Sequence, residues 1–275
     1  MAYDASLADA FWSNRAEKTD ELAAVLHYGM PRMVNDAHSK WELDSVLKSI
    51  TDIGNKNILD LACGNGRVSI PLASISATVT AVDNAEGMLA KCRVNATEAG
   101  VDKKIEFVHA SASNLPFEDE KFDVSLCLGL LEHLPSEIRE LAVGELIRVT
   151  TRGGLIIITV NNANSIYLDR RPTLKITEQH KDGDLKGFFS SLCGKDFLER
   201  IFATKGCQIE VLGTNLFQSF AYNLFREIKP ADADKEIWEE LFKVTTKMDM
   251  MYRQKSGLDG ILADQYTLKI TRNSI

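Results

Sequence analysis

An acid and two glycines stand close together in the stretch NILDLACGNGRVSIPLA, residues 57–73. Asp60 closes an apolar run that is typical of a strand, and Gly64 and Gly66 fall in the turn that follows it. Glycines in such a turn let the backbone approach a ligand without an intervening Cβ, and the start of the next helix offers free N–H groups. The spacing therefore predicts a ligand held largely by main-chain atoms, although ordinary turn glycines would give the same pattern.

A second acid, Asp83, closes the next apolar run along the chain. A dinucleotide fingerprint has the form GxGxxG, followed by an acid about 20 residues later. Gly64, Gly66 and Ser69 with Asp83 come close to that form, so these residues alone leave open a nicotinamide cofactor. A solvated strand end is the plainer alternative for Asp83.

The residues that could do chemistry must be positioned by the surrounding elements. Short apolar runs alternate with helical patterns between residues 50 and 160, as expected for strands that helices cover on both faces. We therefore expect an α/β fold with a doubly wound, Rossmann-like sheet of seven strands. One helix is predicted to start at Ser136 as N-cap and to stop at Gly153 and Gly154. The predicted strands are 58–61, 78–82, 105–108, 124–128, 155–160, 208–212 and 266–272.

Three segments lie outside this alternation. Residues 1–49 are predicted to form an N-terminal helical cap, and residues 50–275 the main domain with a helical insertion at about 218–262. Residues 163–190 are polar and predicted to form a loop. Ligands of open α/β sheets bind beyond the C-terminal strand ends, so we expect the added helices to form a lid there. Packing on the back of the core, or a contact in a homo-oligomer, is the alternative.

Composition narrows the class of protein. The 275 residues are 45% hydrophobic and 26% charged with a net charge of −7, which is typical of a soluble cytoplasmic protein and disfavours nucleic acid as a partner. No secretory signal and no apolar run of membrane-spanning length is found in the sequence, so no membrane partner is expected. The five cysteines form no CxxC pair, which argues for reduced thiols and no metal site.

Taken together, the motifs resemble those of a known family. Asp60-x-Ala62-x-Gly64-x-Gly66 is similar to motif I of the class I S-adenosylmethionine-dependent methyltransferases, and TVTAVDNAEGMLAKCR is similar to the second motif. FVHASASNLPFEDEKFDVSLCLGLLEHLP and ELIRVTTRGGLIIITVNN resemble the later motifs, in the same order. The resemblance implies S-adenosylmethionine as cofactor.

The resemblance also implies roles for individual residues. Asp83 would accept hydrogen bonds from both ribose hydroxyls, and an Arg from the N-terminal helices, Arg15 or Arg32, would pair with the methionine carboxylate, although a solvated helix Arg is the alternative for both. Ala62 replaces the usual first glycine, and Ser111 stands where many members carry an Asp, which lowers the expected strength of cofactor binding. The full predicted cofactor site is Asp60, Ala62, Gly64, Gly66, Asp83, Asn84, Met88, Ser111, Ala112, Leu128, Arg15 and Arg32.

Methyl transfer to a hydroxyl or an amine also needs a proton acceptor. His133, with Glu132 beside it in LLEHLP, follows the fourth strand, where the family's methyl group faces its acceptor, so both residues are predicted to be catalytic. The alternative is that they begin the next helix. No NPPY or DPPY run follows that strand, which favours a small-molecule metabolite as methyl acceptor at oxygen or nitrogen, in a biosynthetic reaction.

Two other functions stay open at this point, an NAD(P)-dependent oxidoreductase and a noncatalytic protein that binds S-adenosylmethionine. For the enzyme, aromatic side chains outside the motifs are predicted to line the acceptor pocket, namely Phe11, Trp12, Tyr28, Tyr167, Phe188 and Phe189.

Overall fold

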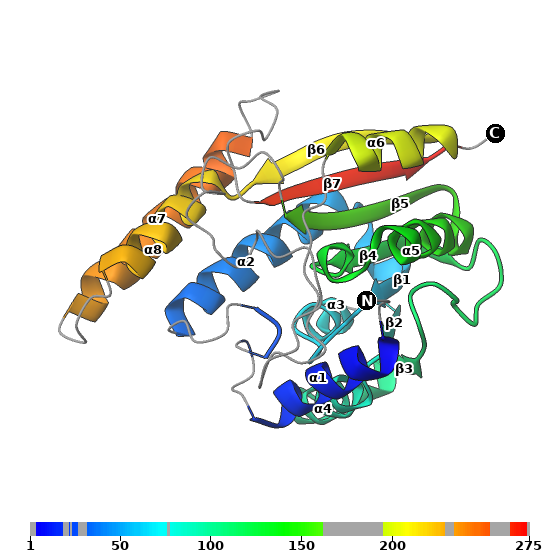
Figure 1. Ribbon diagram of the computed structural model, residues 1–275, viewed down its shortest axis with the longest axis horizontal. Helices are drawn as coiled ribbons and strands as arrows, with labels where there is room; N and C mark the ends of the chain where they lie inside the picture. The colour runs from blue at the N-terminus through cyan, green and yellow to red at the C-terminus, as the bar shows by residue number, and fades with distance from the viewer. Residues whose placement is uncertain are drawn as a thin grey trace.

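A seven-stranded sheet with the order β3-β2-β1-β4-β5-β7-β6 is the centre of the molecule (Figure 1). The computed structural model describes residues 4–18, 22, 24–26, 32–75, 78–161, 195–228, 234–253 and 265–273. The sheet confirms the predicted α/β fold, and each predicted strand has its counterpart. The strands are β1 Asn57–Leu61, β2 Thr78–Asp83, β3 Ile105–His109, β4 Phe122–Leu128, β5 Thr150–Asn161, β6 Cys207–Thr214 and β7 Gln265–Arg272.

The direction of the last strand departs from a purely parallel sheet. Strands β1 to β5 pair in parallel, whereas β7 is antiparallel to both β5 and β6 and lies between them. Among the described residues between β6 and β7, two helices are present, α7 Leu216–Ile228 and α8 Lys235–Arg253. They confirm the helices predicted before the last strand.

Helices cover both faces of the sheet. Helices α2, α3 and α4 pack on one face through residues such as Val46, Leu72 and Cys92, whereas α5 and α6 pack on the other through Leu146 and Phe202. Helix α1 lies side by side with α4 at the edge near β3 (Figure 1). The helix bounds not yet given are α1 Ala5–Lys18, α2 Arg32–Ser49, α3 Ser69–Ser74, α4 Glu86–Glu98, α5 Ser136–Val149 and α6 Lys195–Thr204.

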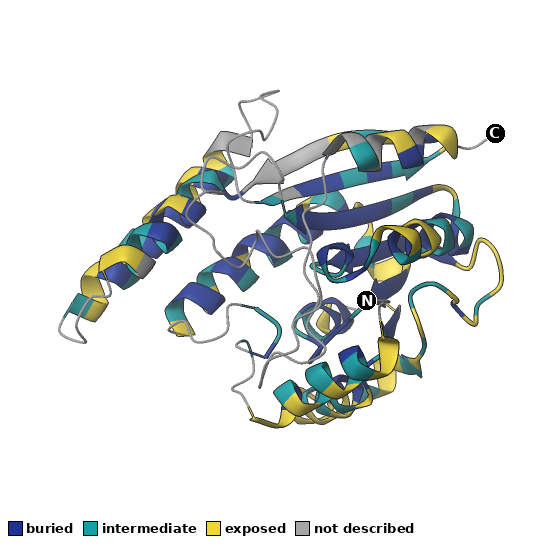
Figure 2. Cartoon of the chain, viewed as in Figure 1, coloured by how far each residue is buried: buried dark blue, intermediate teal, exposed yellow. Residues whose placement is uncertain are grey.

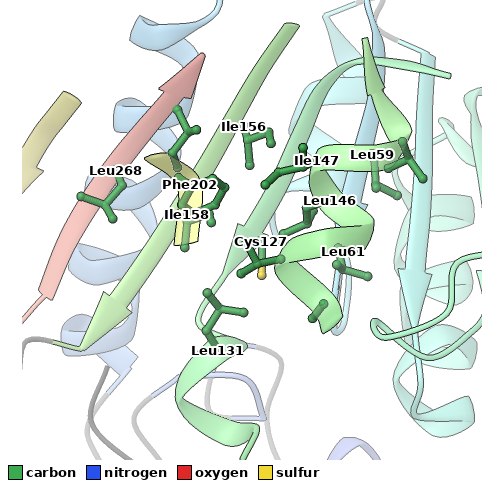
Figure 3. Packing of buried hydrophobic residues seen from close by; sticks show 14 of the residues in the cluster. Leu59, Leu61, Cys127, Leu131, Leu146, Ile147, Ile156, Ile158, Phe202 and Leu268 are labelled. Carbon is green, nitrogen blue, oxygen red and sulfur yellow. The ribbon is translucent and has the colours of Figure 1, made fainter. Parts of the chain in front are cut away.

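The central strands are apolar because they are buried from both sides (Figure 2). On the face below α5 and α6, Leu59, Cys127 and Ile158 are fully buried, and Leu146 and Phe202 close over them (Figure 3). Each fully buried side chain of this size stabilises the fold by about 1.5–3 kcal/mol. This packing fixes the C-terminal ends of β1, β2 and β4, on which the candidate site is built.

The predicted ends of helix α5 are corrected. Pro135, with an extended backbone, occupies the N-cap position, and Ser136 is already helical. The helix ends at Val149, and Gly153 and Gly154 belong to β5, because the chain turns at Thr150 straight into the next strand. The glycines were therefore interpreted wrongly as the helix stop.

The described helices added to the core lie in different places. Helix α1 lines the cavity described below, whereas α7 and α8 pack against each other and α8 packs on α2. Helix α2 itself contributes Val46 to the core of the sheet, and Leu43 and Leu47 pack against that core. The boundary at residue 49 stays a prediction, and the predicted loop 163–190 lies outside the described residues. No described helix has the length and apolar character required to cross a bilayer.

Candidate active site

A cavity of about 270 Å³ opens at the C-terminal ends of β1, β2 and β4. Parallel strands of an open sheet present their ligands at this edge. Helix α1 forms a further wall through Ala8 and Trp12. The predicted residues that line the cavity are Asp60, Ala62, Gly64, Asp83, Asn84, Met88, Ser111, Ala112, Leu128 and His133.

The turn after β1 has the backbone shape that its glycines suggested. Ala62, Gly64 and Gly66 all have left-handed backbone angles, with φ of 61°, 55° and 85°. A Cβ on Gly64 would lie 2.7 Å from Cγ1 of Val25, and one on Gly66 would lie 2.6 Å from Sγ of Cys92. Gly66 therefore does not line the cavity but permits the turn to pack on α4. Ala62 adopts a conformation that costs a residue with a Cβ about 1–2 kcal/mol.

Asp83 ties this turn to the end of β2. One oxygen, Oδ2, accepts a hydrogen bond from Gly64 N–H at 2.9 Å, and the other, Oδ1, accepts one from Ala85 N–H at 2.9 Å. Each carboxylate oxygen retains a second lone pair for a ligand hydroxyl. Burial raises the pKa of Asp83 to about 6, against the two backbone hydrogen bonds, which lower it.

Asp60 lies deeper, only 3% exposed, and its Oδ2 accepts a hydrogen bond from the Ser69 hydroxyl at 2.5 Å. Burial raises the pKa of its carboxyl group. Asp60 therefore links β1 to the first residue of α3 while it also forms part of the cavity wall.

Met88 and Ser111 of the predicted cofactor site both line the cavity. Met88, 2% exposed, packs in the first turn of α4 with Ala85 and with Trp12 of α1. Ser111 is exposed, and its hydroxyl lies 3.0 Å from that of Ser113. The hydroxyl at this position is thus available at the cavity wall.

His133 lies in the single turn Leu131–His133 after β4 and also lines the cavity. Its ring meets that of Trp12 edge to face, with centroids 5.2 Å apart. Glu132 is 3% exposed and is absent from the described cavity lining. Burial raises the pKa of Glu132 to about 7. The prediction that Glu132 stands at the acceptor beside His133 does not match this placement.

The two predicted arginine partners also lie off the cavity wall. Arg15 donates a hydrogen bond to the carbonyl of Leu26 at 3.2 Å, and its guanidinium lies 5.3 Å from the ring centroid of Trp12. Arg32 is on the first turn of α2 with 85% of its side chain exposed, 3.7 Å from Asp36. Arg32 is therefore a solvated arginine on a helix, which was the alternative interpretation of this residue.

Sequence reasoning missed Arg67, the residue directly after Gly66 and the one arginine among the described lining residues. Its guanidinium forms a buried ion pair with Glu42 of α2, whose Oε1 accepts a hydrogen bond from the Thr159 hydroxyl of β5 at 2.6 Å. Adjacency to the glycine turn could have identified Arg67. No sequence motif could have identified Glu42, because it lies on α2, far from the glycine turn in the sequence, and only the folded structure brings it to Arg67.

Of the aromatic residues predicted for an acceptor pocket, Trp12 lines the cavity, and Phe11 packs edge to face on it with centroids 5.1 Å apart. Tyr28, Tyr167, Phe188 and Phe189 lie outside the described residues. Within the described part of the chain, no group of three His, Cys, Asp or Glu side chains is placed to hold a metal ion.

The cavity fits an adenosine nucleoside with an amino-acid tail. The left-handed turn places the Gly64 backbone in the cavity wall, Asp83 supplies carboxylate lone pairs, and Met88 supplies an apolar surface. The third position of a dinucleotide fingerprint holds a glycine or an alanine. Here it holds Ser69, which is buried and donates a hydrogen bond to Asp60.

Known proteins resemble part of this chain. Residues 58–154 match the model of a family described as a methyltransferase domain. A demethylmenaquinone methyltransferase of Clavibacter sepedonicus is 38% identical over 125 residues, 45% of this chain and 49% of that protein. A ubiquinone biosynthesis O-methyltransferase of Pseudomonas entomophila is 32% identical over 158 residues, 52% of this chain and 66% of that protein. The chain thus spans about half to two thirds of the length of these relatives.

A solved structure extends the likeness to the whole fold. Magnesium protoporphyrin IX methyltransferase from Synechocystis PCC 6803, with bound S-adenosylmethionine, superposes with a TM-score of 0.60 at 17% identity and covers 99% of both chains. At this identity the likeness concerns the fold alone. With the family match over residues 58–154 and the residues gathered at the strand ends, it leads to one conclusion: the chain contains a class I S-adenosylmethionine-dependent methyltransferase domain.

Proposed function

We propose that the protein transfers a methyl group from S-adenosylmethionine to an oxygen or nitrogen atom of a small-molecule metabolite. The observation that carries this proposal is the single cavity in which the glycine turn, Asp83 and Met88 share a wall with His133. The residues proposed to bind the cofactor and the residue proposed to accept the proton therefore line the same cavity.

The residues of this chain have separate tasks in the proposed reaction. The cofactor supplies an electrophilic methyl group, so catalysis depends mostly on holding the acceptor in line with it. Asp83 and the Gly64 turn hold the nucleoside end. His133 takes the proton that the acceptor loses as its new bond to carbon forms. Trp12, packed on His133, limits the space for the acceptor.

The acceptor class is narrowed by the relatives. Their names concern ubiquinone biosynthesis and demethylmenaquinone, so hydroxylated aromatic compounds are the first acceptors to test. The proposal also places the protein in the cytoplasm, in a biosynthetic reaction, without a nucleic-acid or membrane partner. The net charge of −7 supports the absence of a nucleic-acid partner, because it gives no long-range attraction to phosphate groups. A homo-oligomer remains an alternative to a monomer.

The test is methyl transfer itself. Purified protein is incubated with methyl-labelled S-adenosylmethionine and a panel of phenols, catechols and amines, with the Asp83→Asn variant as the matched control. We expect label in at least one acceptor with the wild type and a strongly reduced rate with the variant. Binding of S-adenosylhomocysteine without transfer to any panel member would favour the noncatalytic alternative.

A further inference from the structure

A second cavity of about 870 Å³ lies between α2 and the pair α7 and α8, on the side of the molecule where these helices extend beyond the sheet (Figure 1). It shares no described lining residue with the first cavity. Its volume lies in the range of about 300–1,000 Å³ that is usual for small-molecule sites. The proposed methyl transfer does not use it.

The floor of this cavity is aromatic. The rings of Phe225 and Trp238 meet edge to face with centroids 5.1 Å apart, and Phe242 lies 6.4 Å from Phe225. Trp238 is 7% exposed and Phe242 is 2% exposed, so these side chains form a fixed surface. Met33 and Ala37 of α2 continue the apolar surface on the opposite wall. Such a floor suits a hydrocarbon chain or a ring without polar groups.

The described rim is positively charged on both walls. Five cationic residues and two acidic residues line the cavity, in a chain whose net charge is −7. The acids are Asp36 and Glu239. The cations are Arg32 and Lys40 of α2 and Lys235, Lys243 and Lys247 of α8.

The cations of the rim are held only loosely by acids. Lys235 lies 3.8 Å from Glu239, and its side chain is 66% exposed. Exposed pairs of this kind contribute about 0–1 kcal/mol. An anionic ligand could therefore recruit these side chains at little cost. The other described pairs of rim cations are similar, Arg32 with Asp36, Lys40 with Asp44 and Lys243 with Glu240, each at 3.7 Å.

We propose that this cavity binds a soluble amphiphilic anion, a carboxylate or phosphate ester carried on an aliphatic chain. The aliphatic chain of the ligand would lie on Phe225, Trp238 and Phe242, and its anionic group would lie among the lysines of α8. Charge complementarity selects an anion over a cation or a neutral lipid. Walls on two sides suit a single enclosed molecule better than the flat surface of a bilayer.

The first experiment is calorimetric titration with sodium decanoate below its micelle concentration. We expect binding by the wild type and about tenfold weaker binding by Lys243→Glu/Lys247→Glu, because two attractive charges become repulsive. The control Lys48→Glu/Lys103→Glu makes the same change in net charge at exposed lysines outside the cavity and should bind as the wild type does. Decyltrimethylammonium, with the same chain and opposite charge, should not bind.

A second readout locates the binding. Decanoate should change the tryptophan fluorescence of the wild type, and Trp238→Phe should lose that change while it retains the calorimetric signal. Saturation with S-adenosylhomocysteine should leave decanoate affinity unchanged, so this test stands apart from that of methyl transfer. Equal affinity of the two charge-reversed variants, binding of the cation, or sedimentation with phosphatidylglycerol vesicles without decanoate binding would overturn the proposal.

Discussion

At the scale of single residues, Asp83 both holds the backbone of the glycine turn and faces the cavity, so a substitution must separate its effect on folding from its effect on binding. Its oxygens accept hydrogen bonds from Gly64 N–H and Ala85 N–H, and the same carboxylate faces the cavity. An alanine would leave both backbone donors unpaired, so its effect would mix folding with binding. Asparagine retains the shape and one oxygen acceptor, and is the sharper test.

We predict that Asp83→Asn weakens binding of S-adenosylhomocysteine by about 10- to 100-fold, because charge-assisted hydrogen bonds to the ribose are lost. The wild-type affinity should also fall as the pH drops below about 6, where Asp83 becomes protonated, and the variant should lose this dependence. Titration calorimetry between pH 5 and 8 measures both effects, with Asp102→Asn as control. Equal constants for all three proteins would remove Asp83 from the site.

The burial of Glu132 leads to a prediction about how the free energy of unfolding depends on pH. Burial raises the pKa of Glu132 to about 7, with the nearby Glu42 charge as a further raising cause and Arg139 opposing it. The folded state therefore binds a proton that the unfolded state has released, and stability is lost as the pH rises from about 4.5 to about 7. Glu132→Gln should gain roughly 2–3 kcal/mol over the wild type at pH 8, and little at pH 4.5.

Urea denaturation across this pH range measures the difference, and Glu140→Gln, at an exposed position of α5, is the control that should follow the wild type. A gap between wild type and Glu132→Gln that does not vary with pH would mean that Glu132 is not protonated by its burial. A loss of turnover in Glu132→Gln without loss of folding would restore it as a catalytic residue.

His133 is the residue on which proton transfer depends. We predict that His133→Ala lowers turnover by about a hundredfold or more, with little change in cofactor affinity. A histidine base works only when neutral, so wild-type turnover should fall at acidic pH and the variant should lack that limb. If both proteins share the limb and have similar turnover, His133 only supports Trp12 and positioning carries the reaction.

At the scale of elements, α1 is placed by its contact with the start of α4. Asp9 Oδ1 accepts a hydrogen bond from Glu86 N–H at 3.3 Å, and Ser13 Oγ accepts one from Gly87 N–H at 3.0 Å. These bonds satisfy N–H groups that a helix start leaves open. Helix α1 thereby holds Trp12 at the cavity.

Gly87 makes this contact possible, because a Cβ there would lie 2.7 Å from Cα of Ser13. Gly87→Ala should displace α1 and weaken S-adenosylhomocysteine binding about three- to tenfold, since Trp12 and Ala8 move with the helix. Gly144→Ala in α5, with no atom within 4 Å of its Cβ, should leave affinity unchanged and stabilise by up to about 1 kcal/mol. Unchanged affinity in Gly87→Ala would show that α1 is not part of the cofactor site.

The elements also show what the sequence could predict. The strands carrying Asp60 and Asp83 were recognisable because burial on both faces makes them short apolar runs with a polar end. The end of α5 was not, because its C-terminus passes into β5 at Thr150 without a glycine stop. Glu42 was also out of reach, since its pairing with Arg67 joins residues distant in sequence.

At the scale of the whole molecule, the two cavities are lined by different elements. The strand ends of β1, β2 and β4 and helix α1 enclose the first cavity, whereas α2, α7 and α8 enclose the second. The added helices were expected to form one lid, but only α1 among the described helices outside the sheet core lines the first cavity. The fold thus provides two separate spaces for ligands.

The central claim is that the first cavity holds S-adenosylmethionine, and calorimetry of the full chain tests it most directly. Titration at pH 7.5 with S-adenosylmethionine, with S-adenosylhomocysteine and, separately, with NAD compares the two cofactor classes on one protein. We predict saturable one-to-one binding of both sulfur nucleosides and no heat from NAD. Binding of NAD without binding of either sulfur nucleoside would contradict the account.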